Sequence, residues 1–312
     1  MYDYRHQKEL ELDPIVLDVD GEEFKFGFID PRKDMPNTEH LVQQAVDLMR
    51  TKADMSNIGP LLEGLKQAKR AVKWNLFPKI VRRAGFADAT KVIVDAAVRV
   101  ERTNFRLIHS ETVNQLMCFI QKKALDSKWD KKETIKALEL ATKVIETMEE
   151  HKENHPTGLS WNEGMTLRKM PLYRDPQVLA ARLHLAAVLA VKHYGGQDPN
   201  GAVAKYATET LALWPQGTGL LGIHTDLAYS KQQDMGYLAR RAGRSFGWYA
   251  APILHGLKLA AQVVEPGLAK ELLDRAEKVE QEIKESTPQQ ESVEIYEQLF
   301  SPKEEEAVKE EA

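Results

Sequence analysis

The sequence predicts an all-α fold, an α-solenoid or an irregular array of antiparallel helical hairpins, preceded by a small N-terminal β-hairpin. An aromatic residue stands just before Asp and an amphipathic run at Phe86, Trp129 and Tyr173, which are 43 and 44 residues apart by their numbers. That spacing fits two helices and two turns, as in stacked helical repeats. From Thr38 onward apolar residues recur with a helical period, whereas before it they alternate.

The alternation before Thr38 predicts the hairpin. Apolar side chains occupy every second position over residues 15–19 and again over residues 24–28, on either side of Asp20-Gly21. An Asp-Gly pair between two alternating runs is a strong signal for a tight hairpin turn. A hairpin alone is only marginally stable, so we expect it to pack on the helices or on a partner. The sequence leaves open whether it adds a strand to another protein.

The helices follow in order, most of them begun by a capping residue or by Pro in the first turn. An irregular insert is expected over 151–172 and a Gly-rich loop over 214–225. Helices are expected to begin at Thr38, at Ser56 or Asn57 (running to Val72), at Asp88, Ser110 and Asp130, and at Asp175 (to Tyr194) and Asp198 (to about Leu213), and then over Leu227–Ser245, Trp248–Val264, Pro266–Ile283 and Glu291–Phe300.

Charge is distributed unevenly along the chain. Residues 1–65 hold 7 Lys and Arg against 14 Asp and Glu, residues 66–106 hold 11 against 3, and residues 265–312 hold 6 against 15. Together with the changes of pattern, this predicts an N-terminal extension (1–37), helical-hairpin repeats with the basic segment (38–155), a C-terminal helical array (156–285) and an acidic tail (286–312). The net charge of −4 excludes a uniformly basic nucleic-acid coat.

Composition favours an intracellular protein. The single Cys118 excludes an internal disulfide and a cysteine-based zinc site. No apolar run approaches the roughly 18 residues that a membrane helix needs, so no membrane insertion is expected. The first thirty residues are acidic overall and predict neither a secretory signal nor a transit peptide.

The basic segment is the main candidate site. Its cationic residues recur at helical spacing, with Trp74 and Phe77 between them, and this pattern could follow a phosphate backbone and stack on bases. Contact with an acidic protein, pairing within the chain and simple solvation are the alternatives. The candidate residues for binding RNA or an acidic partner are Lys66, Lys69, Arg70, Lys73, Lys79, Arg82, Arg83, Arg99, Arg102 and Arg106. A second basic and aromatic cluster, Arg240 to Tyr249, is explained equally well by packing or by binding.

Signals for catalysis are weak, and we expect no enzyme activity, cofactor, metal or small-molecule substrate. Residues 217–222 match G-x-G-x-x-G but lack the surrounding βαβ unit, which favours a flexible loop. His151 and His155 have metal-ligand spacing, yet they fall at a fraying helix end. His224 and Asp226 could form an acid/base pair, but no nucleophile lies nearby in sequence. A third hypothesis is an enzyme site around residues 217–226, which predicts that a small molecule copurifies with the protein.

The paired helices over 79–126 and 130–151 resemble degenerate tetratricopeptide or pentatricopeptide units. Their period near 43 departs from 34 or 35, and the fixed base-reading positions are missing, so base-by-base RNA reading does not carry over. Residues 38–285, helical hairpins followed by Ala-rich helices, are similar to accessory helical proteins of fungal mitochondrial ribosomes. That resemblance implies a mitochondrial matrix protein with rRNA and ribosomal proteins as partners.

These observations predict a non-catalytic helical scaffold that docks on a ribonucleoprotein, such as the mitochondrial ribosome or its assembly intermediates. The alternative is a protein–protein adaptor that binds a peptide or a helix in a helical groove, without nucleic acid.

Overall fold

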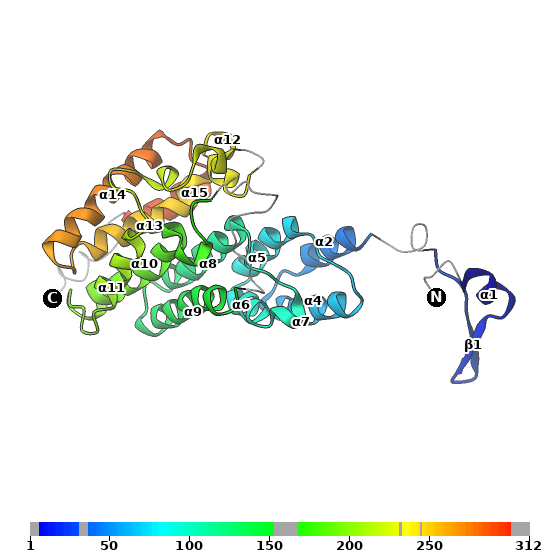
Figure 1. Cartoon of the computed structure of the whole chain (residues 1–312). Helices are drawn as coiled ribbons and strands as arrows, with labels where there is room; N and C mark the ends of the chain where they lie inside the picture. The colour runs from blue at the N-terminus through cyan, green and yellow to red at the C-terminus, as the bar shows by residue number, and fades with distance from the viewer. Residues whose placement is uncertain (1–5, 31–36, 153–167, 231–232, 244, 301–312) are drawn as a thin grey trace. The chain divides into compact units, whose positions relative to one another are not determined.

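The computed structural model describes residues 6–30, 37–152, 168–230, 233–243 and 245–300. It is mostly helical with one small antiparallel pair of strands, which confirms the predicted fold class (Figure 1). The chain divides into two compact units, residues 1–48 and 49–312. The four segments expected from composition remain a prediction.

The first unit contains the predicted hairpin. Asp20 and Gly21 take φ values of 57° and 85°, the left-handed conformations that a two-residue turn between twisted strands requires. The Gly21 N–H also donates to Oδ1 of Asp18 at 2.9 Å. No residue of either strand is buried. The elements of this unit are α1 (Gln7–Leu12), β1 (Ile15–Val19), β2 (Glu22–Phe26) and α2 (Thr38–Leu48).

The second unit is built of helices joined mostly by short loops. Its elements are α3 (Lys52–Met55), α4 (Ile58–Gln67), η2 (Trp74–Leu76), α5 (Phe77–Phe86), α6 (Thr90–Val98), α7 (Val100–Thr103), α8 (Ser110–Asp126), α9 (Lys131–Glu150), η3 (Leu172–Arg174), α10 (Pro176–His193), α11 (Ala202–Leu211), η4 (Leu220–Gly222), η5 (Asp226–Tyr229), α12 (Gly236–Gly243), α13 (Phe246–Ala260), α14 (Pro266–Glu285) and α15 (Gln290–Phe300).

Two of the three aspartates that follow an aromatic residue cap a helix. Asp130 accepts hydrogen bonds from the N–H groups of Lys132 and Glu133 at the start of α9, and Asp175 accepts one from Gln177 at the start of α10. The expected cap at Asp88 is wrong. Asp88 has a φ of 52°, and its carboxylate pairs instead with Lys52 and Lys123, at 3.2 and 2.7 Å.

Two helix predictions are also wrong. The helix expected to run to Val72 ends at Gln67, because Lys69 turns left-handed and the Arg70 N–H closes the helix on the Leu65 carbonyl at 2.8 Å. The helix expected over 227–245 is replaced by the short η5 and α12. Between them the carboxylate of Asp234 accepts a hydrogen bond from the Ser110 N–H, which holds this part of the chain at the start of α8.

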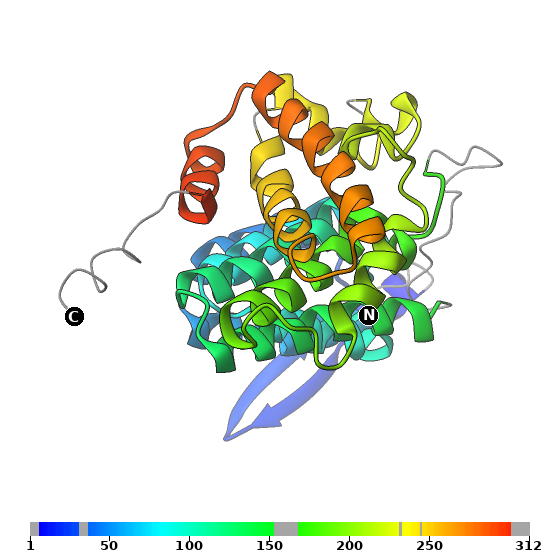
Figure 2. The same cartoon turned by 90° about the vertical axis from the view of Figure 1, so that its left-hand side faces the viewer.

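The core of the second unit centres on α10. This helix is buried along nearly its whole length and packs against α8, α9, α11 and α13. Helix α13 in turn packs against α14 and α15, and Figure 2 shows α14 (orange) lying along α13 (yellow). The helix predicted over Glu291–Phe300 is present as α15. In the described part of the chain, no helix is both long and apolar enough to cross a membrane.

Candidate nucleic-acid interface

Three of the predicted basic residues lie on two adjacent helices, α4 and α7. The ammonium of Lys66 on α4 donates to the carbonyl of Glu101 on α7, and Arg99 at the start of α7 pairs with Glu63 at 3.1 Å. Arg102 lines the same shallow depression of about 390 Å³ as Lys66. Positive charge on this face is thus interleaved with two carboxylates, and part of it is used within the chain.

The loop after α4 carries a second group. Lys69, Arg70 and Lys73 do not continue the row of Lys66 along one helix, because α4 ends before them. Lys69 and Lys73 are exposed, and Arg70 is half-buried. A loop presents its cations without the regular spacing that the sequence suggested, but it keeps three of them within five residues.

The third group of cations, Lys79, Arg82 and Arg83, lies on α5 and differs in exposure. Helix α5 buries Phe77, Ile80 and Ala84 in the core and leaves Arg82 and Arg83 exposed, with Lys79 half-buried.

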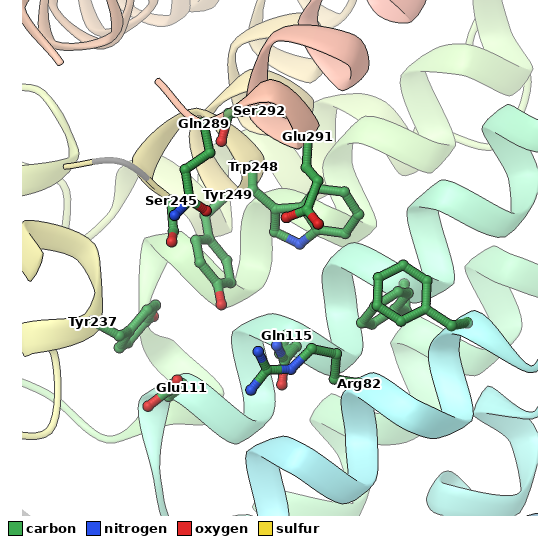
Figure 3. Close-up of a pocket in the computed structure, with 12 residues that line it drawn as sticks. Arg82, Glu111, Gln115, Tyr237, Ser245, Trp248, Tyr249, Gln289, Glu291 and Ser292 are labelled. Atoms are coloured by element: carbon green, nitrogen blue, oxygen red, sulfur yellow. The ribbon is translucent and has the colours of Figure 1, made fainter. Parts of the chain in front are cut away.

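Arg82 lines a cavity of about 350 Å³ whose walls come from α5, α8, α12, α13 and α15. Figure 3 shows Arg82 and Gln115 on one side of this cavity, with Trp248 and Glu291 across from them. The cavity mixes basic, acidic and aromatic side chains.

The two aromatic residues within the basic segment differ in accessibility. Trp74 is 50% exposed, and its ring stacks on the imidazole of His109 with centroids 4.5 Å apart. Phe77 is buried against Phe105, so it cannot serve as a stacking platform for a base. Arg106, in the loop before α8, is exposed and donates to Oδ1 of Asn104 at 3.2 Å. Trp74 therefore remains the aromatic candidate for contact with RNA.

The Gly-rich loop matching G-x-G-x-x-G has an internal partner. The N–H groups of Leu220 and Leu221 donate to the two carboxylate oxygens of Glu282 on α14, at 2.8 and 3.1 Å. Gly219 allows this approach, because a Cβ there would lie 2.2 Å from the Glu282 carboxyl carbon. The loop is thus attached to α14 by a carboxylate at the amides where a phosphate would have to bind.

His224 is paired, but not with Asp226. Its Nε2 lies 3.0 Å from Oδ2 of Asp175, and both side chains are fully buried, whereas Asp226 is exposed. Because the Lys169 N–H donates to Nδ1 of His224, the imidazole carries its proton on Nε2 and donates to Asp175. The pair joins α10 to the 218–230 loop across 49 residues of sequence, a contact that no local pattern could reveal.

A buried histidine pair was also missed by sequence reasoning. Nε2 of His184 on α10 lies 2.9 Å from Nδ1 of His255 on α13, and Nδ1 of His184 bonds Oε1 of Gln121 on α8 at 2.7 Å. Burial lowers the pKa of His184 well below its usual value and, with the nearby charges of Lys192 and Lys258, lowers that of His255 to about 4. Both imidazoles are therefore neutral links between helices.

The remaining candidates carry little chemistry. Cys118 is buried, and burial raises the pKa of its thiol, so it is an inert core thiol. Residues 153–167, which include His155 and most of the insert expected over 151–172, lie outside the described residues. So do the acidic run from Glu304 and the side chains of Arg240, Arg241 and Arg244. Within the described ranges, no three His, Cys, Asp or Glu side chains gather as a metal site.

Comparison with known proteins shows which family the sequence matches. Residues 1–310 match the family model described as mitochondrial ribosomal protein mS27. The chain is also 34% identical over 296 residues to the small ribosomal subunit protein mS27 of Neurospora crassa, a match that covers 90% of this chain and 74% of that protein.

The match confirms the expected place of the chain, a helical scaffold on the mitochondrial ribosome in the mitochondrial matrix, with rRNA and ribosomal proteins as partners. The tetratricopeptide- or pentatricopeptide-like repeat is not confirmed. Of the three aromatics that suggested it, Phe86 is 62% exposed whereas Trp129 is buried, so they do not occupy equivalent positions. The chain belongs to the mS27 family of mitochondrial ribosomal proteins.

Proposed function

We propose that this chain is a non-catalytic helical scaffold of the mitochondrial small ribosomal subunit, docked on ribosomal RNA through residues 66–106. The observation that carries the proposal is the concentration of charge: 11 Lys and Arg against 3 Asp and Glu, in a chain with a net charge of −4. Of the ten candidate residues, all but Arg70 and Lys79 are exposed. Phosphate contacts from such side chains give affinity without requiring base recognition.

The three cations of the loop after α4 are the best test, because they lie outside the helices. The variant carries Lys69→Glu, Arg70→Glu and Lys73→Glu. A matched control carries the same change of charge on exposed lysines of α9 and α11, namely Lys132→Glu, Lys143→Glu and Lys205→Glu. Binding to the small-subunit rRNA is measured for both proteins as a function of salt.

We expect the loop variant to bind at least a hundredfold more weakly at low salt than the control. The slope of the logarithm of the binding constant against the logarithm of the salt concentration is negative. Its magnitude should be smaller by about 2 to 3 for the loop variant, because three phosphate contacts are lost. Circular dichroism checks that both variants keep their helices. Equal binding by the loop variant and the control would refute the assignment of this loop.

Two observations favour the adaptor as a second candidate function. Lys66 and Arg99 already have partners within the chain, and the cavity beside Arg82 contains Gln115, a buried side chain whose Oε1 has no hydrogen-bond partner among the residues that the structure describes. A peptide donor could satisfy that oxygen. This function predicts binding that is insensitive to salt and is lost on Phe86→Ser, a change at an exposed residue of the cavity rim.

A further inference from the structure

The N-terminal hairpin has one apolar face that is exposed. In its register Ile15 lies opposite Phe26, Leu17 opposite Phe24 and Val19 opposite Glu22. Opposite residues of an antiparallel pair share a face, so five large apolar side chains lie together. Each of the five is between 37% and 53% exposed. A two-stranded sheet with its apolar face in water is marginally stable, which calls for a covering surface.

Charge identifies the class of that surface. The opposite face of the hairpin carries Asp18, Glu23 and Lys25 beside Val16. Over residues 13–30 there are six Asp and Glu and one Lys. Such a segment is repelled by RNA phosphates and attracted to a surface rich in Lys and Arg. The occupant is therefore a protein, with an apolar patch bordered by basic side chains.

The second unit of the same chain offers no comparable apolar patch in its described part. Its exposed large hydrophobic side chains are single residues on different elements or loops, namely Trp74, Phe86, Val98, Tyr194, Leu227, Leu273 and Val293. Isolated exposed apolar residues are ordinary on a protein surface and do not form a docking site. A neighbouring protein is thus the better occupant.

We propose that the apolar face of the hairpin (Ile15, Leu17, Val19, Phe24 and Phe26) docks on an apolar, basic-edged surface of a neighbouring protein in the ribosomal assembly. The proposal rests on the proposed function for the assembly but not for the RNA contact. The hairpin would tie the chain to a protein neighbour, whereas the basic segment contacts RNA. The acidic side chains around the hairpin would also keep it away from the rRNA.

Photo-crosslinking tests this directly in the full-length protein. A benzophenone amino acid replaces Phe24 on the apolar face or Lys25 on the opposite face, and mitochondria are irradiated and then fractionated on a gradient. We expect a strong adduct from position 24 to one other protein, migrating with the small subunit, and a weaker one from position 25. An adduct to rRNA or to residues 49–312 of the same chain, or no adduct, would overturn the proposal. A protein adduct outside the small subunit would support the docking face while contradicting the proposed function.

A pair of double variants tests the energetics. Leu17→Thr with Phe24→Thr removes two opposed apolar side chains, and Glu23→Thr with Lys25→Thr alters the other face. Thr is favourable in strands, and the Asp20-Gly21 turn is untouched, so both keep the hairpin signals. We expect the first variant to associate with small subunits about tenfold more weakly and the second to change little. Equal association by both variants would contradict docking through the apolar face.

Discussion

The carboxylate of Asp175 and the imidazole of His224 lie 3.0 Å apart in the interior of the second unit, with neither side chain exposed to solvent. Oδ1 of the same carboxylate accepts from the Gln177 N–H at 2.9 Å, so one residue both caps α10 and binds the 218–230 loop. Gln177 continues the contact, because its amide donates to the Leu220 carbonyl and accepts from Asn114 on α8. A single buried polar network therefore connects α8, α10 and the loop.

Breaking this pair should destabilise the protein strongly. Asp175→Ala removes the cap of α10 and leaves the Nε2–H of His224 buried without an acceptor, which we expect to cost about 3 to 5 kcal/mol in the free energy of unfolding. Urea denaturation measures the loss. The control is Asp226→Ala, at the exposed carboxylate beside His224 in sequence, which should change stability by less than about 0.5 kcal/mol. Comparable losses in both variants would contradict the pairing.

Glu282 should matter for the loop rather than for the helix that carries it. Glu282→Ala leaves the N–H groups of Leu220 and Leu221 without their acceptor, at an expected cost of about 1 to 3 kcal/mol. Hydrogen exchange should accelerate at these two amides in particular. Glu285→Ala on the same helix, at an exposed residue, serves as the control. If the amides of Leu220 and Leu221 stay protected in the Glu282 variant, the carboxylate does not hold the loop.

Because α10 and α13 approach closely at Gly256, replacing this glycine with Ala should destabilise the protein. A Cβ at Gly256 would lie 2.6 Å from the Cβ of His184, so Gly256→Ala must push the two helices apart, at about 1 to 3 kcal/mol. Gly64 on α4 has no described atom within 4 Å of such a Cβ, and there Ala should be neutral or stabilising by up to about 1 kcal/mol. The midpoint of thermal unfolding should fall for Gly256→Ala and stay the same or rise for Gly64→Ala, and a gain of stability at Gly256→Ala would refute the packing.

The buried histidine pair predicts a loss of stability in mild acid. The pKa of His255 is about 4 in the folded chain and 6.5 as a free side chain, so the unfolded state binds more protons between these values. The contribution of neutral His255 to the free energy of unfolding is fully present above pH 6.5 and is lost as the pH drops toward 4. This loss should amount to about 2 kcal/mol between pH 7 and 5. His184, lowered in the same direction, adds to the loss.

Urea denaturation at the two pH values measures this dependence. His255→Asn should show a smaller loss between pH 7 and 5 than the unaltered protein, whatever its stability at pH 7. An unchanged pH dependence in that variant would show that His255 is not the titrating group.

The sequence predicted what local chemistry decides. The Asp20-Gly21 turn and the caps at Asp130 and Asp175 depend on neighbours within a few residues, and all three are present. The cap expected at Asp88 failed because a distant partner decides there, whereas the early end of α4 at Gln67 is a local turn at Lys69. Asp88 leaves its expected helix cap for lysines 36 and 35 residues away in sequence, Lys52 and Lys123.

The same distinction applies to the candidate site. Composition located the basic segment, but only tertiary structure shows that Lys66 and Arg99 contact α7 and Glu63, that Arg82 lines a separate cavity, and that Phe77 is buried. The partner of His224 could not be predicted either, because Asp175 lies 49 residues away in sequence. The sequence therefore locates the basic segment, but tertiary packing decides which of its cations are paired within the chain and which line a cavity.

We expect this chain to contact ribosomal RNA in the mitochondrial small subunit through residues 66–106. The most direct measurement is ultraviolet crosslinking of intact small subunits, followed by mass spectrometry of the peptides that carry nucleotide adducts. We expect adducts concentrated between Lys66 and Arg106, with the half-exposed Trp74 among the modified residues, and none on the acidic hairpin. Adducts confined to other segments of a chain that is present in the subunit would contradict this expectation.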